Sequence, residues 1–239
     1  MTMNQCLNRV CLCLKRYNDF MGYGSVSSPY AEKKIISLGN NCLSRSFPTE
    51  WGMKPRKEYG EKSMPFDLMW NTHKAVTFYL LVRFYSFFKN IYFDKDRKFF
   101  VRTRPFYTLF NHGADLGNDF QALKKRYKAR IKNLYDALKS DNHLIFIQNS
   151  ESGDHDINNL YEVIRFYRKK KPFTLIIMDL SPIYTIDKKV INDKVILIKE
   201  PYPTHNWIWY DHTLRASELG HLFESRLRKK LQYIIENLE

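Results

Sequence analysis

Apolar positions along the chain follow two different spacings, and their alternation predicts strands separated by helices. Short, nearly continuous apolar runs occupy residues 35–38, 144–147, 173–178 and 195–198, as in buried strands. Between and after them, spacings of three and four residues predict amphipathic helices. The clearest of these begins at Asp119 and has the apolar positions Phe120, Leu123, Tyr127, Ile131, Leu134 and Leu138. The pattern predicts an α/β fold, a three-layer sandwich around a mostly parallel sheet, Rossmann-like or flavodoxin-like/SGNH-hydrolase-like.

The region between the first strand and Asp119 is less regular. A short helix is expected from about Cys42, and Pro48 is expected either to limit it or to start a new turn. Residues 64–67 are expected to be extended and to lead into a helix over about residues 72–90. The last helix is expected to be capped by Ser217.

The domain prediction is simple. Residues 1–31 are expected to form a flexible N-terminal tail, and residues 32–239 a single α/β domain. The tail holds three of the four cysteines, so no disulfide framework is expected in the domain, which suits a reducing, cytoplasmic compartment. The N-terminus lacks the pattern of a signal peptide. The richest apolar run, residues 76–88, is too short to span a membrane.

The charge of the chain is strongly positive. It has 39 Lys and Arg against 25 Asp and Glu, which gives a net charge of +14. This charge favours anionic partners such as a glycan carrier or a membrane surface, including peripheral attachment at the inner membrane. Nucleic acid is not indicated, because no recognition motif is found. Basic faces of amphipathic helices are also common simply because they are solvated, so the charge alone assigns no function.

The most informative candidate site is the turn Ser37-Leu38-Gly39-Asn40-Asn41-Cys42, between the first strand and the following helix. Gly39 permits a tight turn, and Asn40 and Asn41 tolerate the left-handed backbone. Because N–H groups and the positive end of a helix lower the pKa of a thiol, we expect Cys42 to favour the thiolate. The asparagine amides and nearby N–H groups would stabilise an oxyanion. The alternative is a small buried cysteine that packs the strand–helix junction.

Two further motifs follow this turn. They are Ser63-Met64-Pro65-Phe66-Asp67 and Phe110-Asn111-His112, and a basic helix and an apolar strand come next. Together they resemble an uncharacterised, mainly bacterial family described as papain-like cysteine peptidases, over roughly residues 35–147. Leu68 stands where that family has tryptophan. The resemblance implies a cysteine–histidine hydrolase or transferase, and its members' proximity to genes for surface polysaccharide synthesis implies a glycan-linked or carrier-linked substrate.

Several side chains compete to assist Cys42. His112 is the expected base, since it follows the cysteine as in papain-like sites and is expected where a strand enters a loop. Asp67 is a candidate to orient it, although capping a helix or pairing with an arginine is the alternative for that carboxylate. Asn149 and Asp179 are other candidate orienting residues, because both close predicted strands.

A rival arrangement takes its partners from a late, aromatic-rich loop. Hydrolases whose nucleophile follows the first strand often do so, and His205, Asp211 and His212 are the candidates here. No spacing typical of a metal site is present in the domain, and neither a phosphate-binding loop nor a dinucleotide-binding motif follows a strand. No metal or cofactor is therefore expected.

The sequence thus predicts a thiol-dependent hydrolase or acyl-type transferase with a small-molecule, peptide or glycan-linked substrate. The alternative is a non-catalytic basic binding protein for an anionic polymer.

Overall fold

The computed structural model describes residues 33–112, 114–150, 157–183, 186–190 and 192–238. The tail expected over residues 1–31 lies outside these ranges. In chain order the strands and longer helices are β1 (Lys33–Ser37), α2 (Leu43–Glu50), α3 (His73–Leu81), β2 (Ile91–Asp94), β3 (Phe99–Arg102), β4 (Thr108–Phe110), α4 (Phe120–Lys139), β5 (His143–Ser150), α5 (Ile157–Arg168), β6 (Phe173–Asp179), β7 (Val195–Lys199), α6 (His212–Ala216) and α7 (Glu218–Glu236). Single 3-10 turns are η2 (Lys57–Tyr59), η3 (Ala114–Leu116) and η4 (Lys188–Val190).

The four strands expected from the apolar runs form one parallel sheet in the order β1-β5-β6-β7. The α/β class and the parallel sheet are therefore confirmed. Among the described strands β1 lies at an edge, whereas the first strand is internal in the Rossmann and flavodoxin orders. A second, antiparallel sheet of β2, β3 and β4 was not expected from the sequence.

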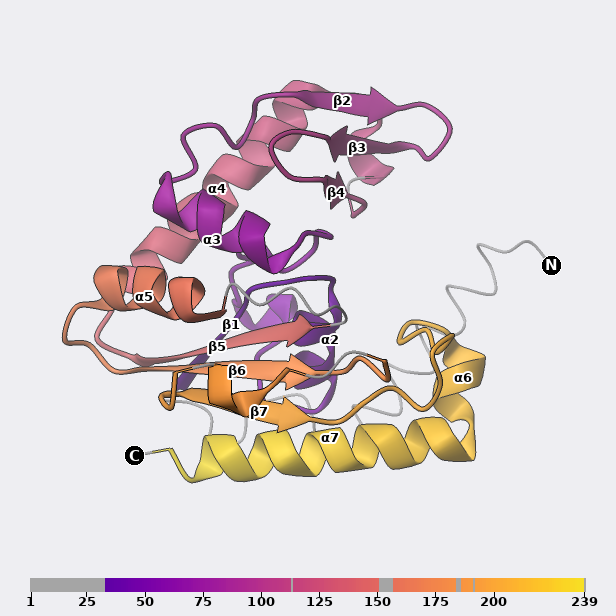
Figure 1. The fold of residues 1–239 in the computed structure, drawn as a ribbon. Helices are drawn as coiled ribbons and strands as arrows, with labels where there is room; N and C mark the ends of the chain where they lie inside the picture. Colours follow the sequence, from indigo (N-terminus) through magenta and orange to yellow (C-terminus); the bar gives the residue numbers. More distant parts are fainter. Residues whose placement is uncertain (1–32, 113, 151–156, 184–185, 191, 239) are drawn as a thin grey trace.

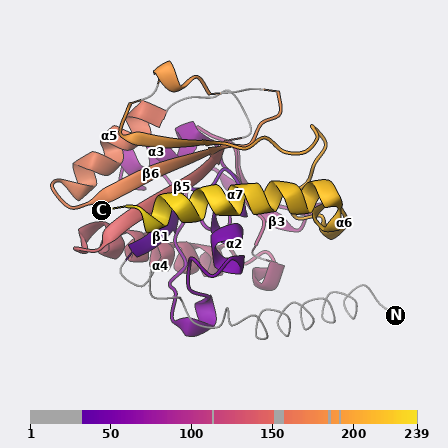
Figure 2. The same ribbon diagram turned by 90° about the horizontal axis from the view of Figure 1, so that it is seen from below.

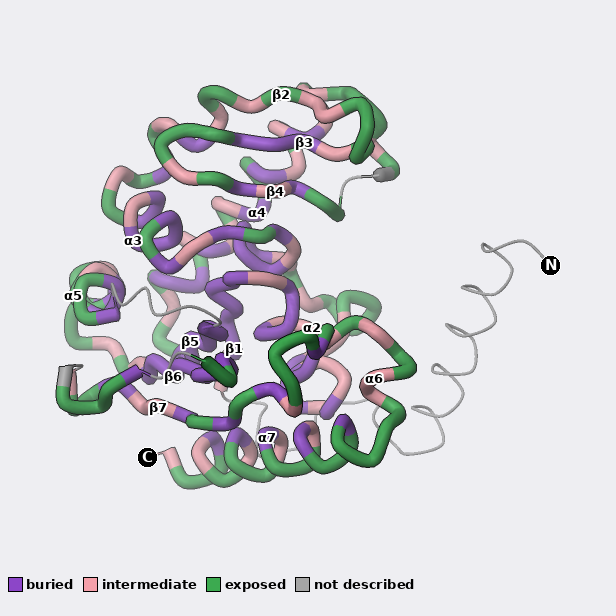
Figure 3. The backbone as a smooth tube through the Cα atoms, turned by 45° about the vertical axis from the view of Figure 1, so that its right-hand side comes forward, coloured by how far each residue is buried: buried purple, intermediate pink, exposed green. Residues whose placement is uncertain are grey.

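Helices pack on both faces of the parallel sheet (Figures 1 and 2). Because side chains alternate along a strand, neighbouring residues of β1 enter different cores. Ile36 joins the core beneath α3, α4 and α5, while Ile35 joins the core beneath α2 and α7. Figure 3 shows the result, with buried residues concentrated in the strands β5 and β6. The near-continuous apolar runs in the sequence reflect this burial on two sides.

Three local expectations need correction. The helix expected over about residues 72–90 ends at Leu81, because Arg83 and Phe84 adopt left-handed backbone with φ of 51° and 58°. Residues 64–67 form a turn rather than an extended segment. Pro48 lies inside α2, which continues to Glu50. The cap expected at Ser217 is confirmed, since its side chain accepts a hydrogen bond from the N–H of Gly220.

Among the described residues no helix is both long enough and apolar enough to cross a membrane.

Candidate active site

The turn after β1 is fixed by its backbone. Gly39 and Asn40 have φ of 77° and 47°, which confirms the left-handed conformations expected there. The hydroxyl of Ser37 accepts a hydrogen bond from the N–H of Gly39 and also contacts the hydroxyl of Ser44 at 2.6 Å. Oδ1 of Asn41 accepts from the N–H of Leu43 at 2.9 Å. These contacts place Cys42 at the N-cap of α2.

A short segment connects this turn to β4. The N–H of Asn71 donates to the carbonyl oxygen of Asn40 at 2.9 Å, and Trp70 pairs with Leu109 by two backbone hydrogen bonds. β4 ends one residue later, at Phe110, and leads directly to His112. We call residues 70–71 the connecting segment. It holds the turn that carries Cys42 beside β4, the strand that leads to His112.

The structure brings these two side chains together. Sγ of Cys42 lies 3.0 Å from Nε2 of His112, although the residues are 70 positions apart in the sequence. Both line a cavity of about 710 Å³. Its walls come from the turn, the connecting segment, the antiparallel sheet and the loop after β7, and they are rich in aromatic side chains: Trp70, Tyr107, Tyr202, Trp207, Trp209 and Tyr210.

The pair lies in an environment that favours its neutral form. Burial raises the pKa of Cys42 to about 12, and this outweighs the opposing effects of Arg45 and Arg130. Desolvation, reinforced by the charges of Arg130 and Arg45, lowers the pKa of His112. The expectation that the start of a helix would lower the pKa of the Cys42 thiol is therefore wrong, because the side chain is only 4% exposed.

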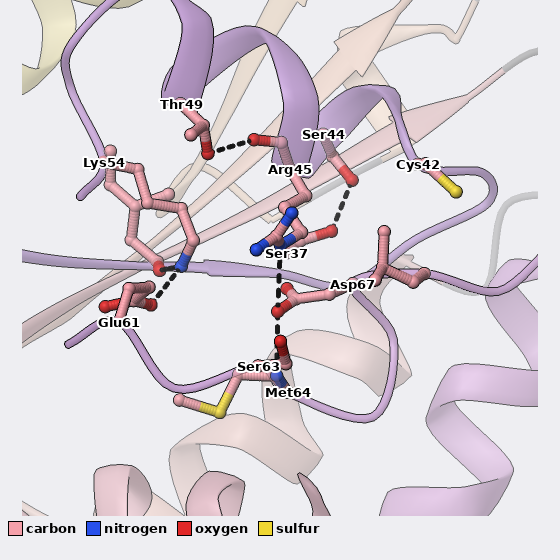
Figure 4. A network of polar contacts seen from close by, with 12 residues as sticks. Ser37, Cys42, Ser44, Arg45, Thr49, Lys54, Glu61, Ser63, Met64 and Asp67 are labelled. Atoms are coloured by element: carbon pink, nitrogen blue, oxygen red, sulfur yellow. Dashed lines mark hydrogen bonds and ion pairs between the residues drawn. The ribbon is translucent and has the colours of Figure 1, made fainter. Parts of the chain in front are cut away.

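Asp67 does not orient His112 through any contact of the described structure. Its Oδ2 accepts a hydrogen bond from the N–H of Met64 at 2.7 Å and lies 3.3 Å from Nε of Arg45 (Figure 4). The carboxylate is fully buried. Its role is thus the structural alternative, an ion pair that joins the turn at residues 64–67 to α2.

The backbone of His112 is held from α4. Nη1 of Arg126 lies 3.4 Å from the carbonyl oxygen of His112, and the same guanidinium pairs with Asp115. Nε2 faces the thiol, and in the described part of the chain Nδ1 has no hydrogen bond to a side chain. The loop therefore positions the imidazole through its backbone.

The rival residues lie elsewhere. His205 and His212 are exposed, and the carboxylate of Asp211 caps α6 by accepting from the N–H groups of Thr213 and Leu214. Neither histidine contacts Cys42, whose side-chain hydrogen bond goes to His112. Their loop still contributes, because Trp207 and its neighbours form one wall of the cavity.

The other candidate orienting residues are buried at the ends of their strands. The N–H of Asn149 donates to the carbonyl oxygen of Gly39 at 3.4 Å, which links β5 to the turn. Oδ2 of Asp179 accepts from the N–H of Ile186. Both positions are as expected, at the carboxyl ends of parallel strands.

Sequence reasoning missed the arginines near the pair and the wall formed by Trp70 and Tyr107. One signal was available for Arg130. It lies three residues after Tyr127 and four before Leu134, on the buried face of α4, where a charged side chain is unusual. Trp70 and Tyr107 become neighbours only through the pairing of Trp70 with β4, which local periodicity does not indicate.

No cluster of three or more His, Cys, Asp or Glu side chains suited to a metal ion occurs in the described part of the chain. Comparison with known proteins found no matching family model, no matching curated protein and no matching solved structure.

Proposed function

We propose that this protein is a thiol-dependent hydrolase or acyl-type transferase in which Cys42 is the nucleophile and His112 the general base. The observation that carries the proposal is the 3.0 Å contact between Sγ of Cys42 and Nε2 of His112. A thiol within hydrogen-bond reach of an imidazole is the arrangement that nucleophilic catalysis needs. Its position on the wall of a large cavity gives a substrate access to the sulfur.

The reaction begins from the neutral pair. As the sulfur bonds to the acyl carbon, its proton moves to Nε2 of His112, and the carbonyl oxygen becomes an oxyanion. When the oxyanion collapses, the bond to the leaving group breaks and the imidazolium returns its proton to that group. Water or an acceptor hydroxyl or amine, deprotonated by His112, then attacks the thioester. The carbon–sulfur bond breaks, and the imidazolium returns the proton to the sulfur, which restores the neutral Cys42 thiol. The raised pKa of Cys42 and the lowered pKa of His112 both favour this general-base route over a preformed thiolate–imidazolium pair.

Asn41 is the proposed oxyanion donor. It lines the cavity next to Cys42, and its Oδ1 is engaged by the N–H of Leu43. The contact at Oδ1 fixes the plane of the side-chain amide, which Nδ2 shares. The N–H of Leu43 is used in this hydrogen bond, which makes the side chain a better candidate than that backbone group. Gly39 and Asn40 act by shaping the turn.

The test uses an activated ester, p-nitrophenyl acetate, as the acyl donor. The expected result is a burst of p-nitrophenol equal in amount to the enzyme, with an acetyl group on the tryptic peptide 35–45, which contains Cys42 and no other cysteine. Cys42→Ala abolishes both signals. His112→Ala keeps the thiol but slows acetylation by about 10²- to 10⁴-fold, the contribution typical of a general base.

The rival base supplies the control. His212→Ala removes an exposed histidine that does not contact Cys42, so acetylation should continue at the wild-type rate. Acetylation that depends on His212 and not on His112, or that never reaches Cys42, contradicts the proposal.

A second candidate function, binding of an anionic polymer, is favoured by a different cavity. This cavity, of about 490 Å³, is lined by Arg83, Lys139 and Lys169 together with Tyr135, Leu138, Phe166 and Tyr167. It combines positive charge with aromatic faces, and none of the described residues in its wall is acidic. Salt-sensitive retention on heparin that Arg83→Gln weakens, and that Cys42→Ala leaves unchanged, would support this function if no acylation is found.

A further inference from the structure

Three charged side chains, Arg45, Asp67 and Arg130, act electrostatically on Cys42, and their charges do not balance. Arg45 and Asp67 neutralise one another, with Nε and Oδ2 3.3 Å apart. Arg130 has no carboxylate of the described residues within ion-pair distance, and it is only 8% exposed. The sum of +1, −1 and +1 leaves one uncompensated positive charge beside the thiol.

Helix geometry directs Arg130 toward the site. Arg126, four residues earlier, reaches the carbonyl oxygen of His112, and residues four apart lie on the same face of a helix. The guanidinium of Arg130 stacks on the ring of Tyr127 at 4.7 Å, and that ring packs against Phe110 at 4.9 Å, two residues before His112. Although burial dominates the pKa of both Cys42 and His112, the charge of Arg130 acts on both as well.

A buried charge without an oppositely charged partner is costly, and such groups are normally paired. The stack on Tyr127 fixes the plane of the guanidinium but supplies no negative charge. A guanidinium presents N–H donors in a flat fork that matches the oxygens of a carboxylate or a phosphate. Arg130 is not among the residues that line the cavity, so a ligand that supplies the missing partner must reach past Cys42 and His112, on which the charge of Arg130 acts.

We propose that Arg130 recognises an anionic group, a carboxylate or phosphate, which the substrate carries close to the bond that Cys42 attacks. This inference rests on the proposed function in naming the substrate class. The charge arrangement itself can be tested without any turnover, so the two can fail separately.

The test compares two alkylating agents of similar size, anionic iodoacetate and neutral iodoacetamide. Their rates at Cys42 are followed by mass spectrometry of the tryptic peptide 35–45, with the full chain and at one pH. The ratio of the two rates cancels the ionisation of the thiol. We expect iodoacetate to be favoured at Cys42 by about tenfold relative to the same ratio for free cysteine, as a nearby charge in a poorly screened site would give.

Variants assign the preference to one side chain. Arg130→Gln should lower the ratio to the value for free cysteine, and Arg130→Lys should retain most of it. Lys128→Gln removes the same charge from an exposed position of α4 and should leave the ratio unchanged. Arg97→Gln tests a different arginine, one that lines the cavity and donates a hydrogen bond to the hydroxyl of Tyr107. Thermal unfolding and the near-ultraviolet circular dichroism of each variant establish that it is folded.

Three results of the alkylation experiment would overturn the proposal. A wild-type ratio equal to that of free cysteine overturns the proposal, as does a ratio that folded Arg130→Gln retains or that Arg97→Gln alone removes. If Arg130→Gln does not fold, retention of the preference in Arg130→Lys and its loss in Arg130→Met decide instead.

Protection experiments identify the anion. Acetate and inorganic phosphate are added separately at equal ionic strength, and the slowing of iodoacetate at Cys42 is measured. Slowing by acetate alone assigns a carboxylate, and slowing by phosphate alone assigns a phosphate. If neither anion slows the reaction, the site does not bind such groups and the proposal fails.

Discussion

The chemistry of single residues in this protein is set by desolvation more than by position in the fold. Cys42 lies at the N-cap of a helix, where a thiol is expected to ionise easily, yet burial raises its pKa to about 12. Partial desolvation of the imidazole, together with the charges of Arg130 and Arg45, lowers the pKa of His112, although the residue as a whole is exposed. Each pKa shift favours the neutral form of its side chain. At neutral pH His112 is therefore an unprotonated base, and the thiol of Cys42 keeps its proton.

The pH dependence of acylation follows from this pair. His112 must be neutral to accept the proton, and its pKa is lowered from the ordinary value of about 6.5. The rate of acetylation of Cys42 should therefore be at its maximum at neutral pH, and it should fall only as the pH drops through that lowered pKa. It should show no decline on the alkaline side from His112, which is already neutral there. A bell-shaped profile with an alkaline limb between about pH 8 and 9 would indicate a thiolate–imidazolium pair instead.

Asn41 has two roles that one substitution can separate. Asn41→Asp keeps an oxygen to accept from the N–H of Leu43, and a carboxylate is favourable at the start of a helix, so the thermal midpoint should not fall. It removes the Nδ2 donor, so kcat for ester cleavage should drop by about 10²- to 10³-fold. Asn41→Ala removes both groups and should lose stability as well as kcat. Retention of kcat in either variant would assign the oxyanion to other donors.

At the scale of elements, the site depends on the connecting segment at residues 70–71. It joins the turn after β1 to β4, and through β4 to His112. The side chain of Asn71 is fully buried against Gly39, where an added Cβ would lie 2.9 Å from Nδ2. Gly39 therefore serves two needs, a left-handed backbone and close approach of the segment.

Two glycines with similar backbones allow these needs to be distinguished. Gly39 and Gly60 have φ of 77° and 85°, but an added Cβ at Gly60 would meet no atom within 4 Å. Gly60→Ala should cost about 1–2 kcal/mol for the left-handed conformation alone. Gly39→Ala should reduce the free energy of unfolding by a larger amount, because the added Cβ also displaces Asn71. It should slow acetylation of Cys42, because the turn after β1 would move away from β4. Equal losses of unfolding free energy in denaturant titrations would show that the contact with Asn71 is unimportant.

The sequence predicted some of these elements and missed others for physical reasons. The parallel strands and α4 were predictable because their apolar spacing reflects burial. The antiparallel sheet was not, since its strands have three or four residues each and no residue of β2 is fully buried, which leaves little periodic signal. Cys42 and His112 were identified by residue type and motif. Their environment, including Arg45 and Arg130, depends on packing between α2, α4 and the turn at residues 64–67, which no local pattern contains.

At the scale of the whole molecule, the cavity is formed where separate parts of the chain meet. The parallel sheet supplies Cys42, the antiparallel sheet leads to His112, and the loop between β7 and α6 supplies much of the aromatic wall. That wall has an inner layer that belongs to the core and an outer layer that does not. Trp207 is 6% exposed and Tyr210 is 65% exposed.

These two layers predict opposite effects of truncation. The ring of Trp207 packs against Phe223 of α7 at 4.9 Å and against Tyr202 at 5.0 Å, in the core beneath that helix. Trp207→Ala should therefore reduce the free energy of unfolding by about 3–5 kcal/mol. Tyr210→Ala removes an exposed ring and should change stability by no more than about 0.5 kcal/mol.

The exposed layer should affect substrate binding rather than stability. Tyr210→Ala should raise KM for an ester with a longer acyl chain, p-nitrophenyl butyrate, while kcat stays near wild type, because the ring contacts the bound substrate and not the reacting atoms. With p-nitrophenyl acetate, whose acyl group is shorter, the rise in KM should be smaller. Equal KM values for Tyr210→Ala and wild type with both esters would mean that the exposed layer does not face the substrate. The binding surface would then lie on the opposite wall, formed by Trp70 and Tyr107, whose rings meet edge to face at 5.8 Å.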